Sequence, residues 1–497
     1  MLQSKLKDKT LMKKTSLGGD AVRLTFSKAV TICITTATAM ILSRFCSLEE
    51  YGTYSSMLLV INLFVSIFML GLPSSINYFL ARAEDDDEKK HFLSVYYTAS
   101  TILSFVIGLL LVLSVPLIEK YFENDTISRF WYFLALYPWA TIISSSIENV
   151  LVVYQRVNML VICKFISSAM ILLSLIAVQL FGFGFSVYIA VFVAVNCLYA
   201  LIVYIITHRI SKGLRALIDT GTIKKILVFS LPIGLSTVVG TLSIEIDKLL
   251  IGYFMDTDQL AIYSNAAKEL PLTIVAASIT AVLLPRAAVL IKNGRVERAV
   301  RLWNISTELS IIIISLFTAG IFTYARDVVT FLYSEKYLPG VTVFRIYTLI
   351  LPIRCTYFGL ILNSMGKTKK ILLCSILNLI LNAVLNPLFY YLFGMEGPAA
   401  ATLFSIIVLS PLMLKFTSDV SNVRFSKVFP WKAVGVIFII NAAFSILFYY
   451  IKNLLPFQQF IGELAESILL GVIWSAGYFC IMRKRLKRDW KELNSAE

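Results

Sequence analysis

Long apolar stretches alternate with short polar connections along almost the whole chain. Fourteen of these stretches are long enough to cross a bilayer as a helix. They cover roughly residues 22–44, 52–82, 92–117, 128–154, 159–181, 185–207, 225–254, 259–291, 304–325, 340–365, 369–393, 396–418, 431–452 and 461–483. Because lipid offers no partners to the backbone, such spans must be helical when they face it. The pattern therefore predicts an all-α polytopic membrane protein.

The apolar pattern also repeats within the chain. EEYGTY at 49–54 matches DQLAIY at 258–263, Leu72-Pro73 matches Leu284-Pro285, and LFGFGFSVY at 180–188 matches LFGMEGPAA at 392–400. The three offsets are nearly constant, at about 210 residues. Each copy holds six spans, so the copies share one orientation in the membrane. This predicts two parallel six-helix lobes around a central cavity, followed by two further helices.

The repeat and the charged connections together divide the chain into six parts. We expect a basic N-terminus at 1–21, an N-lobe at 22–207, a linker at 208–224, a C-lobe at 225–418, two helices within 431–483 and a basic tail at 484–497.

The composition is typical of a membrane protein, and the positions of the basic residues predict which side of the membrane each connection occupies. Hydrophobic residues make up 58% of the chain and charged residues only 15%, whereas soluble chains are about 25% charged. If the N-terminus is cytoplasmic, 32 of the 45 lysines and arginines fall in cytoplasmic segments and 5 in outer ones. Cytoplasmic loops are the ones enriched in Lys and Arg. Both termini are therefore expected in the cytoplasm, and the net charge of +15 does not point to nucleic acid.

Cofactor and metal chemistry receive no support from the sequence. The seven cysteines lack metal or redox spacing, and the two histidines fall at expected helix ends. Gly366-Lys367-Thr368 resembles the end of a phosphate-binding loop, but the preceding glycine is misplaced and no strand precedes it. We expect no cofactor and no metal.

Two polar stripes interrupt the apolar spans at matching places in the two copies. Thr31, Thr35 and Thr38 follow Lys28 at helical spacing in the first copy. In the second copy the stripe consists of Ser230, Gly234, Thr237, Thr241, Glu245 and Lys248. Residues three and four apart share a helix face. A polar face is costly against lipid, so both stripes are expected to face protein or a watery cavity.

Basic side chains outnumber acidic ones within the spans, which suggests an anionic ligand such as a pyrophosphate. The expected cavity residues are Lys28, Thr31, Thr35, Thr237, Thr241, Lys248, Lys268, Arg286 and Arg354. Three acidic residues are candidates for binding a coupling ion: Glu245, Asp247 and Glu308. Only one of Arg345 and Arg354 can face the cavity from a regular helix, and we prefer the deeper Arg354.

Structural interpretations compete with these assignments. Lys28, Lys164 and Arg286 lie near cytoplasmic helix ends, where a long basic side chain can extend its charge to the interface. Glu245 and Lys248 are three residues apart and could form a local ion pair. Glu308 lies near the inner start of its span and could simply be interfacial.

Several segments carry a family resemblance. FSLPIGLS, IEIDKLLIGYF and AIYSNAAKEL in the second copy, with SRFCSLEEYGTYSSMLL in the first, resemble the signatures of Wzx-type polysaccharide flippases. These flippases belong to a superfamily that also contains MATE exporters and lipid II flippases. Asp247 and Lys248 match the family's aspartate–basic pair, and Tyr263 to Lys268 matches a further segment. Glu269 departs from the uncharged residue that is usual there.

The resemblance implies a flippase that moves undecaprenyl-pyrophosphate-linked oligosaccharide across the bacterial inner membrane by alternating access, for surface polysaccharides such as O-antigen. Its expected partners are the lipid-linked oligosaccharide, membrane lipids, a proton or sodium ion for coupling, and a polysaccharide polymerase with its chain-length regulator. The alternative is an ion-coupled multidrug or cation exporter of the same superfamily, whose cavity should be rich in carboxylates. An enzyme such as a polymerase or ligase is disfavoured, because the outer connections are all short.

Overall fold

The computed structural model describes residues 17–268, 270, 272–454 and 462–495, and this part of the chain is helical throughout. The first half contains α2 (Leu17–Phe45), α3 (Leu48–Met69), α4 (Leu72–Leu80), α5 (Asp86–Leu113), α6 (Val115–Phe122), the 3-10 helix η2 (Ile127–Phe130), α7 (Trp131–Val153), α8 (Val157–Leu180) and α9 (Phe185–Ile210).

The second half begins with α10 (Thr220–Phe254), α11 (Thr257–Ala266), α12 (Thr273–Lys292), α13 (Val296–Thr323), α14 (Ala325–Tyr333) and the 3-10 helix η3 (Glu335–Gly340). It continues with α15 (Val341–Arg354), α16 (Leu360–Ser364), α17 (Thr368–Phe393), α18 (Glu396–Ser421), α19 (Phe425–Val428), α20 (Trp431–Leu454) and α22 (Glu463–Ser495).

Within the described residues, 13 helical segments are long and apolar enough to cross a membrane. The remaining expected span, 259–291, is divided between α11 and α12. The prediction of an all-α polytopic membrane protein is therefore confirmed.

Three spans that the sequence predicts as continuous are broken, so the predictions for 52–82, 259–291 and 340–365 are wrong in this respect. The first breaks at Leu70 and Gly71, whose φ angles of 43° and 71° lie in the left-handed region. Pro73 stands in the first turn of α4, where its missing N–H costs no helical bond. The other breaks lie between α11 and α12 and between α15 and α16. Hydropathy does not register the first break, because the backbone turns within apolar sequence.

The element order of the first half recurs in the second. In each half, a long helix is followed by a short helix and a 3-10 helix: α6 and η2 after α5, and α14 and η3 after α13. A broken helix precedes this unit in both halves, α3 with α4 and α11 with α12. This shared order supports an internal duplication, for which 22–207 and 225–418 remain our proposed units.

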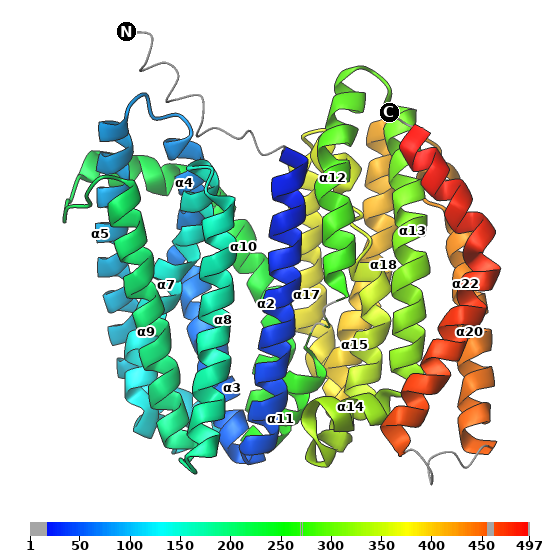
Figure 1. The fold of residues 1–497 in the computed structure, drawn as a ribbon, viewed down its shortest axis with the longest axis horizontal. Coiled ribbons are helices and arrows are strands. Elements are labelled where there is room, and N and C mark those ends of the chain that lie inside the picture. Colours follow the sequence, from blue (N-terminus) through cyan, green and yellow to red (C-terminus); the bar gives the residue numbers. More distant parts are fainter. Residues whose placement is uncertain (1–16, 269, 271, 455–461, 496–497) are drawn as a thin grey trace, which may run out of the picture.

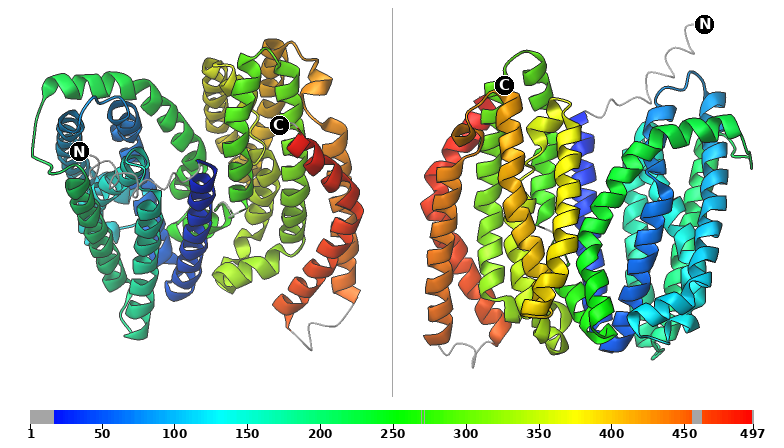
Figure 2. Two further views of the ribbon diagram at one scale, coloured as in Figure 1. Left: turned by 45° about the horizontal axis from the view of Figure 1, so that its top comes forward. Right: turned by 180° about the vertical axis from the view of Figure 1, so that it is seen from behind.

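The helices form two bundles side by side (Figures 1 and 2). One bundle contains α3 to α9, and the other contains α12 to α22. Helix α2 lies on one side of the seam between them, packed on α8 and also touching α12 and α14. Helix α10 lies on the other side, where it contacts both α3 and α17 (Figure 2, right). We use the word seam for the contacts of α2–α9 with α10–α22.

Helix α2 begins and α22 ends at the same end of the molecule (Figure 1). We call this end the terminal face and the opposite end the distal face. Connections 81–85, 154–156 and 211–219 lie at the terminal face, and connections 181–184 and 255–256 lie at the distal face.

Candidate functional site

Lys268 lies in the break between α11 and α12. Its Nζ donates hydrogen bonds to the Tyr51 hydroxyl at 2.7 Å and to Asn265 Oδ1 at 2.9 Å. Tyr51, on α3, also donates to Asn265 Oδ1 at 2.8 Å. An ammonium group carries three N–H donors, and the Lys268 side chain is exposed. Lys268 therefore joins the two halves of the chain and keeps capacity to bind a ligand.

Arg354 ends α15, at the point where the third broken span turns. It lines a small hollow together with Lys268, Tyr347 and Thr348. It also lines a cavity of about 370 Å³ between α10, α15, α17 and α18. The polar side chains of that cavity are Ser243, Thr356, Ser375, Asn378 and Ser410. The hollow thus brings two expected basic residues together beside a mainly apolar cavity that carries a few hydroxyl and amide groups.

Arg345 takes a different position from Arg354. Its Nε donates to the Phe322 carbonyl at 3.3 Å, and its guanidinium lies 5.7 Å from the centre of the Phe322 ring. Of the two arginines, Arg354 is the one that reaches the hollow beside Lys268.

Asp247 lies buried where α10, α11 and α15 meet, with 1% of its surface exposed. Its Oδ2 accepts hydrogen bonds from the hydroxyls of Tyr263, at 3.0 Å, and Tyr347. Its Oδ1 accepts from the backbone N–H of Lys248 at 2.9 Å. A buried carboxylate of this kind is stabilised by its hydrogen bonds.

Glu245 and Lys248 form the local ion pair that was the alternative interpretation of their spacing. The Lys248 Nζ lies 2.7 Å from Glu245 Oε2, and the two side chains are 19% and 15% exposed. Each charge already has a partner, so a ligand would have to compete with the pair.

Much of the polar stripe on α10 packs against α3 and α4 instead of lining an open cavity. Ser230 is fully buried, and a Cβ on Gly234 would lie 2.1 Å from the Leu70 carbonyl carbon. Thr241 accepts a hydrogen bond from Ser66 at 3.0 Å. Thr237 is exposed and donates to the Ile233 carbonyl of its own helix. The small and polar residues thus allow α10 to approach the break in the first half closely.

The stripe on α2 faces the first bundle. The Lys28 Nζ lies 3.7 Å from Glu148 Oε1 on α7, and Lys164 on α8 forms an ion pair with the same carboxylate. Thr31 lines a cavity together with Glu148 and Lys164. Thr35 is exposed and bonds to its own helix at Ile32.

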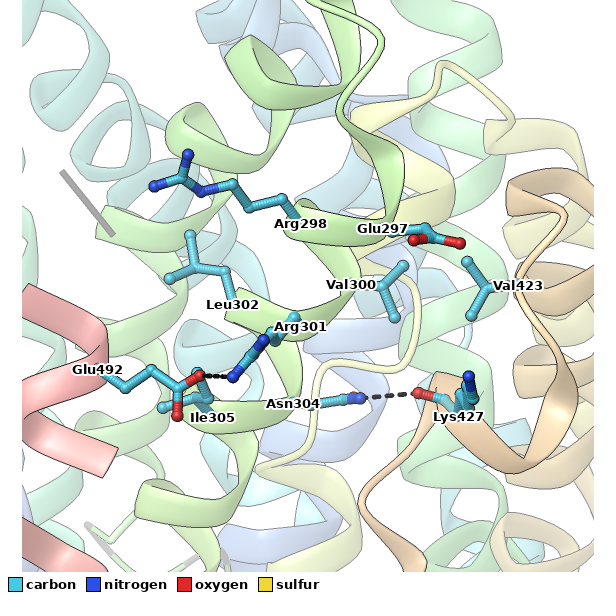
Figure 3. A pocket seen from close by; sticks show the side chains of 10 residues that line it. All are labelled: Glu297, Arg298, Val300, Arg301, Leu302, Asn304, Ile305, Val423, Lys427 and Glu492. Atoms are coloured by element: carbon cyan, nitrogen blue, oxygen red, sulfur yellow. Dashed lines mark hydrogen bonds and ion pairs between the residues drawn. The ribbon is translucent and has the colours of Figure 1, made fainter. Parts of the chain in front are cut away.

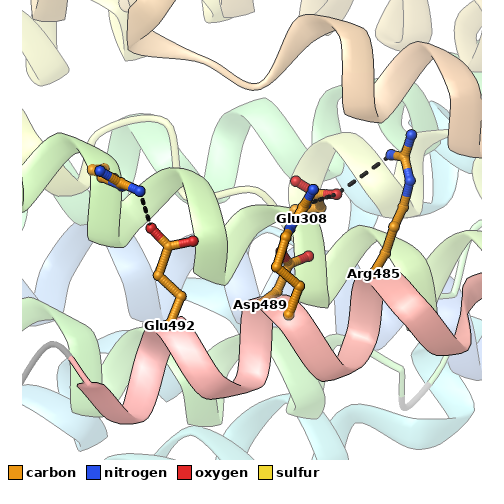
Figure 4. Close-up of polar contacts among 6 residues, drawn as sticks. Glu308, Arg485, Asp489 and Glu492 are labelled. Atoms are coloured by element: carbon orange, nitrogen blue, oxygen red, sulfur yellow. Dashed lines mark hydrogen bonds and ion pairs between the residues drawn. The ribbon is translucent and has the colours of Figure 1, made fainter.

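Glu308 lies away from the other expected site residues. It is 7% exposed on α13 and accepts from Arg485 at 3.4 Å and from Arg488 at 3.2 Å, both on α22 (Figure 4). Asp489, also on α22, is 1% exposed beside it. These contacts attach the last helix to α13. Arg286, an exposed residue of α12, is not among the residues lining the Lys268 hollow.

A larger cavity, of about 670 Å³, lies at the terminal face between α13, α19 and α22 (Figure 3). Two contacts cross it: Arg301 pairs with Glu492, and the Asn304 side-chain amide donates to the backbone carbonyl of Lys427 at 2.9 Å. Acidic and basic side chains are mixed along its wall. Cavity size alone therefore does not identify the site.

Hydrogen bonds across the seam gather at the distal face. Arg44, at the end of α2, donates to the carbonyls of Thr330 and Leu332 at the end of α14. Lys336 donates to the Cys46 carbonyl. Helices α3 and α11 touch at Gly52, where a Cβ would lie 2.0 Å from the Thr257 carbonyl oxygen. The two halves are thus held together at this end, next to Lys268.

Sequence reasoning missed the partners of the expected residues. Asn265 stands one helical turn before Lys268, so its spacing could have suggested the contact. Tyr51 and Tyr347 gave no such signal, because a tyrosine in an apolar span is usually a packing residue. Lys164 was considered only as a basic residue near a helix end, and Glu148 was not assigned to the site. Glu269 lies outside the described residues.

Comparison with known proteins shows which family this chain matches. Residues 41–342 match the family described as polysaccharide biosynthesis protein. Two curated relatives are probable multidrug resistance proteins NorM: one from Mannheimia succiniciproducens, 26% identical over 41% of this chain, and one from Pasteurella multocida, 27% identical. The chain spans about half the length of these relatives, 46%.

The similarity to solved structures extends further along the chain. The lipid II flippase MurJ in its inward closed conformation superposes with a TM-score of 0.73 at 17% identity, covering 93% of this chain and 99% of MurJ. An inward-facing multidrug resistance MATE transporter of the MOP superfamily superposes with a TM-score of 0.63 at 15% identity. The superposition covers 79% of this chain and 94% of the transporter. At these identities the likeness concerns the fold. The chain has the fold of these transporters, and it belongs to the polysaccharide biosynthesis protein family.

Proposed function

We propose that this protein flips undecaprenyl-pyrophosphate-linked oligosaccharide across the bacterial inner membrane by alternating access, for surface polysaccharide assembly. The observation that carries the proposal is the meeting of Lys268 and Arg354 in one hollow, at two breaks in helices that cross the membrane. A guanidinium and an ammonium are the groups that bind phosphate oxygens best.

In this mechanism the two basic groups hold the pyrophosphate while the lipid tail stays in the bilayer. The hydroxyl and amide groups of the cavity beside Arg354 contact the part of the head group next to the phosphates. The distal contacts of Arg44, Lys336 and Lys268 break as the bundles rock, and the head group is released on the other side. A polymerase and its chain-length regulator would take up the product.

The NorM relatives favour one alternative, an ion-coupled exporter of drugs or cations. A cationic cargo would need carboxylates that are free to bind it. In the described residues, Glu245, Glu308 and Glu148 each pair with a basic side chain, which favours the anionic cargo.

The function is tested by complementation. A bacterial strain that lacks its own flippase, and whose repeat-unit structure matches, should regain surface polysaccharide when this protein is expressed. Its lipid-linked precursor should fall to the normal level. Restored drug efflux without restored polysaccharide would support the exporter instead.

Asp247 is our candidate for proton coupling. All three of its hydrogen bonds come from donors, the two tyrosine hydroxyls and the Lys248 N–H. Protonation would add an O–H that must itself find an acceptor, and so would change the hydrogen bonds at the junction of α10, α11 and α15. We expect Asp247→Asn to fold but to transport at a rate that no longer depends on a proton gradient. Transport measured in vesicles with and without the gradient tests this. An equal response in the variant and the wild type would exclude Asp247.

The orientation follows from the charge of the connections, and we propose that the terminal face is cytoplasmic. A cysteine at Asp256, on the distal face, should then react with a membrane-impermeant maleimide in intact cells. A cysteine at Gly213, in the connection between α9 and α10, should react only after the cells are opened. Labelling of the second site in intact cells would reverse the orientation.

A further inference from the structure

A further cavity, of about 290 Å³, lies where α2 packs on α7, α8 and α9 of the first bundle. Its wall consists largely of hydroxyl side chains: Thr31, Ser144, Ser145, Ser167, Ser168 and Tyr199. Glu148 and Lys164 complete it. Polar groups without partners are costly within a membrane bundle. A hydroxyl-rich wall at this place therefore indicates a polar ligand.

The hydroxyl groups retain hydrogen-bonding capacity. The Thr31 Oγ1 is buried, and within the described part of the chain it has no hydrogen-bond partner. Ser145 donates to the Ile142 carbonyl of its own helix at 2.7 Å, so its oxygen can still accept. A ligand that both donates and accepts hydrogen bonds would satisfy this wall.

The charges narrow the class of ligand. Glu148 is paired with two ammonium groups, Lys164 and Lys28. A cation would have to displace one of them, and the three charges together leave one positive charge. The cavity thus suits a neutral or acidic ligand better than a cation or a cationic drug.

The charged residues of the cavity lie on its side nearer the terminal face. Glu148 stands near the end of α7 at Val153, and Lys164 near the start of α8 at Val157. The Lys28 and Glu148 side chains are 57% and 40% exposed. A ligand can therefore approach from the side that we assign to the cytoplasm.

We propose that this cavity binds a saccharide unit of the cargo's head group, an inference that rests on the proposed function. Ring hydroxyls pair with the serine and threonine hydroxyls, while Glu148 and Lys164 add charge-assisted hydrogen bonds. A site built to hydrogen-bond hydroxyl groups rejects analogues that lack them. The hydroxyl wall would then select the sugar, while Lys268 and Arg354 recognise the pyrophosphate common to all such carriers.

The test uses the purified full-length protein and the free oligosaccharide. The probe is the repeat unit released by mild acid from the lipid-linked precursor that accumulates in a strain lacking this protein. Thr31→Val and Ser145→Ala should each weaken its binding by about 2- to 12-fold, the range for a lost hydrogen bond between neutral groups. Ser104→Ala on α5, whose hydroxyl bonds to its own helix at Thr101, should bind as the wild type does.

A second ligand separates this inference from the proposed function. Binding of undecaprenyl pyrophosphate without sugar should depend on Lys268 and Arg354 and be unchanged in Thr31→Val. If the carrier binds but the oligosaccharide does not, or if both cavity variants bind the oligosaccharide normally, the saccharide site is refuted and the proposed function stands. If the carrier itself does not bind, the proposed function fails.

Discussion

Lys268→Gln and Arg354→Gln should each insert into the membrane normally and yet fail to restore surface polysaccharide in a flippase-null strain. Each variant removes a charged donor from the hollow that the two residues share. A lost hydrogen bond to a charged group costs about 1.5–3 kcal/mol, or about 10- to 150-fold in affinity for the pyrophosphate. The lipid-linked precursor should accumulate on the inner leaflet, which a leaflet-specific assay of the precursor measures.

Two controls separate binding from structure. Lys427→Gln removes an exposed basic side chain at the terminal face and should complement fully. Lys268→Arg keeps a cation in the break between α11 and α12 and should restore part of the activity. If the Gln variants complement as well as Lys427→Gln at low expression, the two residues are structural, and the anionic cargo loses its main physical support.

Gly52→Ala should open the distal face. A Cβ at this position would lie 2.0 Å from the backbone oxygen of Thr257, so α3 and α11 must separate. Overpacking of this kind costs about 1–3 kcal/mol, which shifts the balance of closed and open states by about 5- to 150-fold.

Cys46 reports this change, because it is 1% exposed at the distal face and its carbonyl accepts from Lys336 of the other half. Burial raises the pKa of the Cys46 thiol, and the Glu50 carboxylate raises it further. The closed state therefore holds very little of the reactive thiolate. Impermeant maleimide should label Cys46 much faster in Gly52→Ala than in the wild type, once the other cysteines are replaced. Gly320→Ala, where a Cβ meets no atom within 4 Å, is the matched control and should not change the rate. Equal rates in all three proteins would exclude a closure at Gly52.

The architecture was accessible from the sequence because lipid imposes a simple rule on apolar spans. Recurrence of the Leu72-Pro73 pattern at Leu284-Pro285 also indicated the duplication. The breaks were not accessible, since the turn at Leu70 and Gly71 lies within apolar sequence, and hydropathy measures side chains and not backbone direction.

The site could be predicted as a set of residues but not as an arrangement. Helical spacing identified the Glu245–Lys248 pair, because that contact is local. It could not show that Lys268 and Arg354 share a hollow, which depends on how α11 and the break after it pack on α15. Glu308 looked like an isolated intramembrane acid because its partners on α22 come from the far end of the chain.

Transbilayer movement of the cargo in proteoliposomes tests the central claim most directly. The purified protein is reconstituted with lipid-linked oligosaccharide on one leaflet, and the appearance of the head group on the other leaflet is followed with a membrane-impermeant glycosidase. The wild type should move the head group much faster than protein-free vesicles, and the Lys268→Gln/Arg354→Gln double variant should not. Movement by the double variant at the wild-type rate, or none above background by the wild type, would contradict the account.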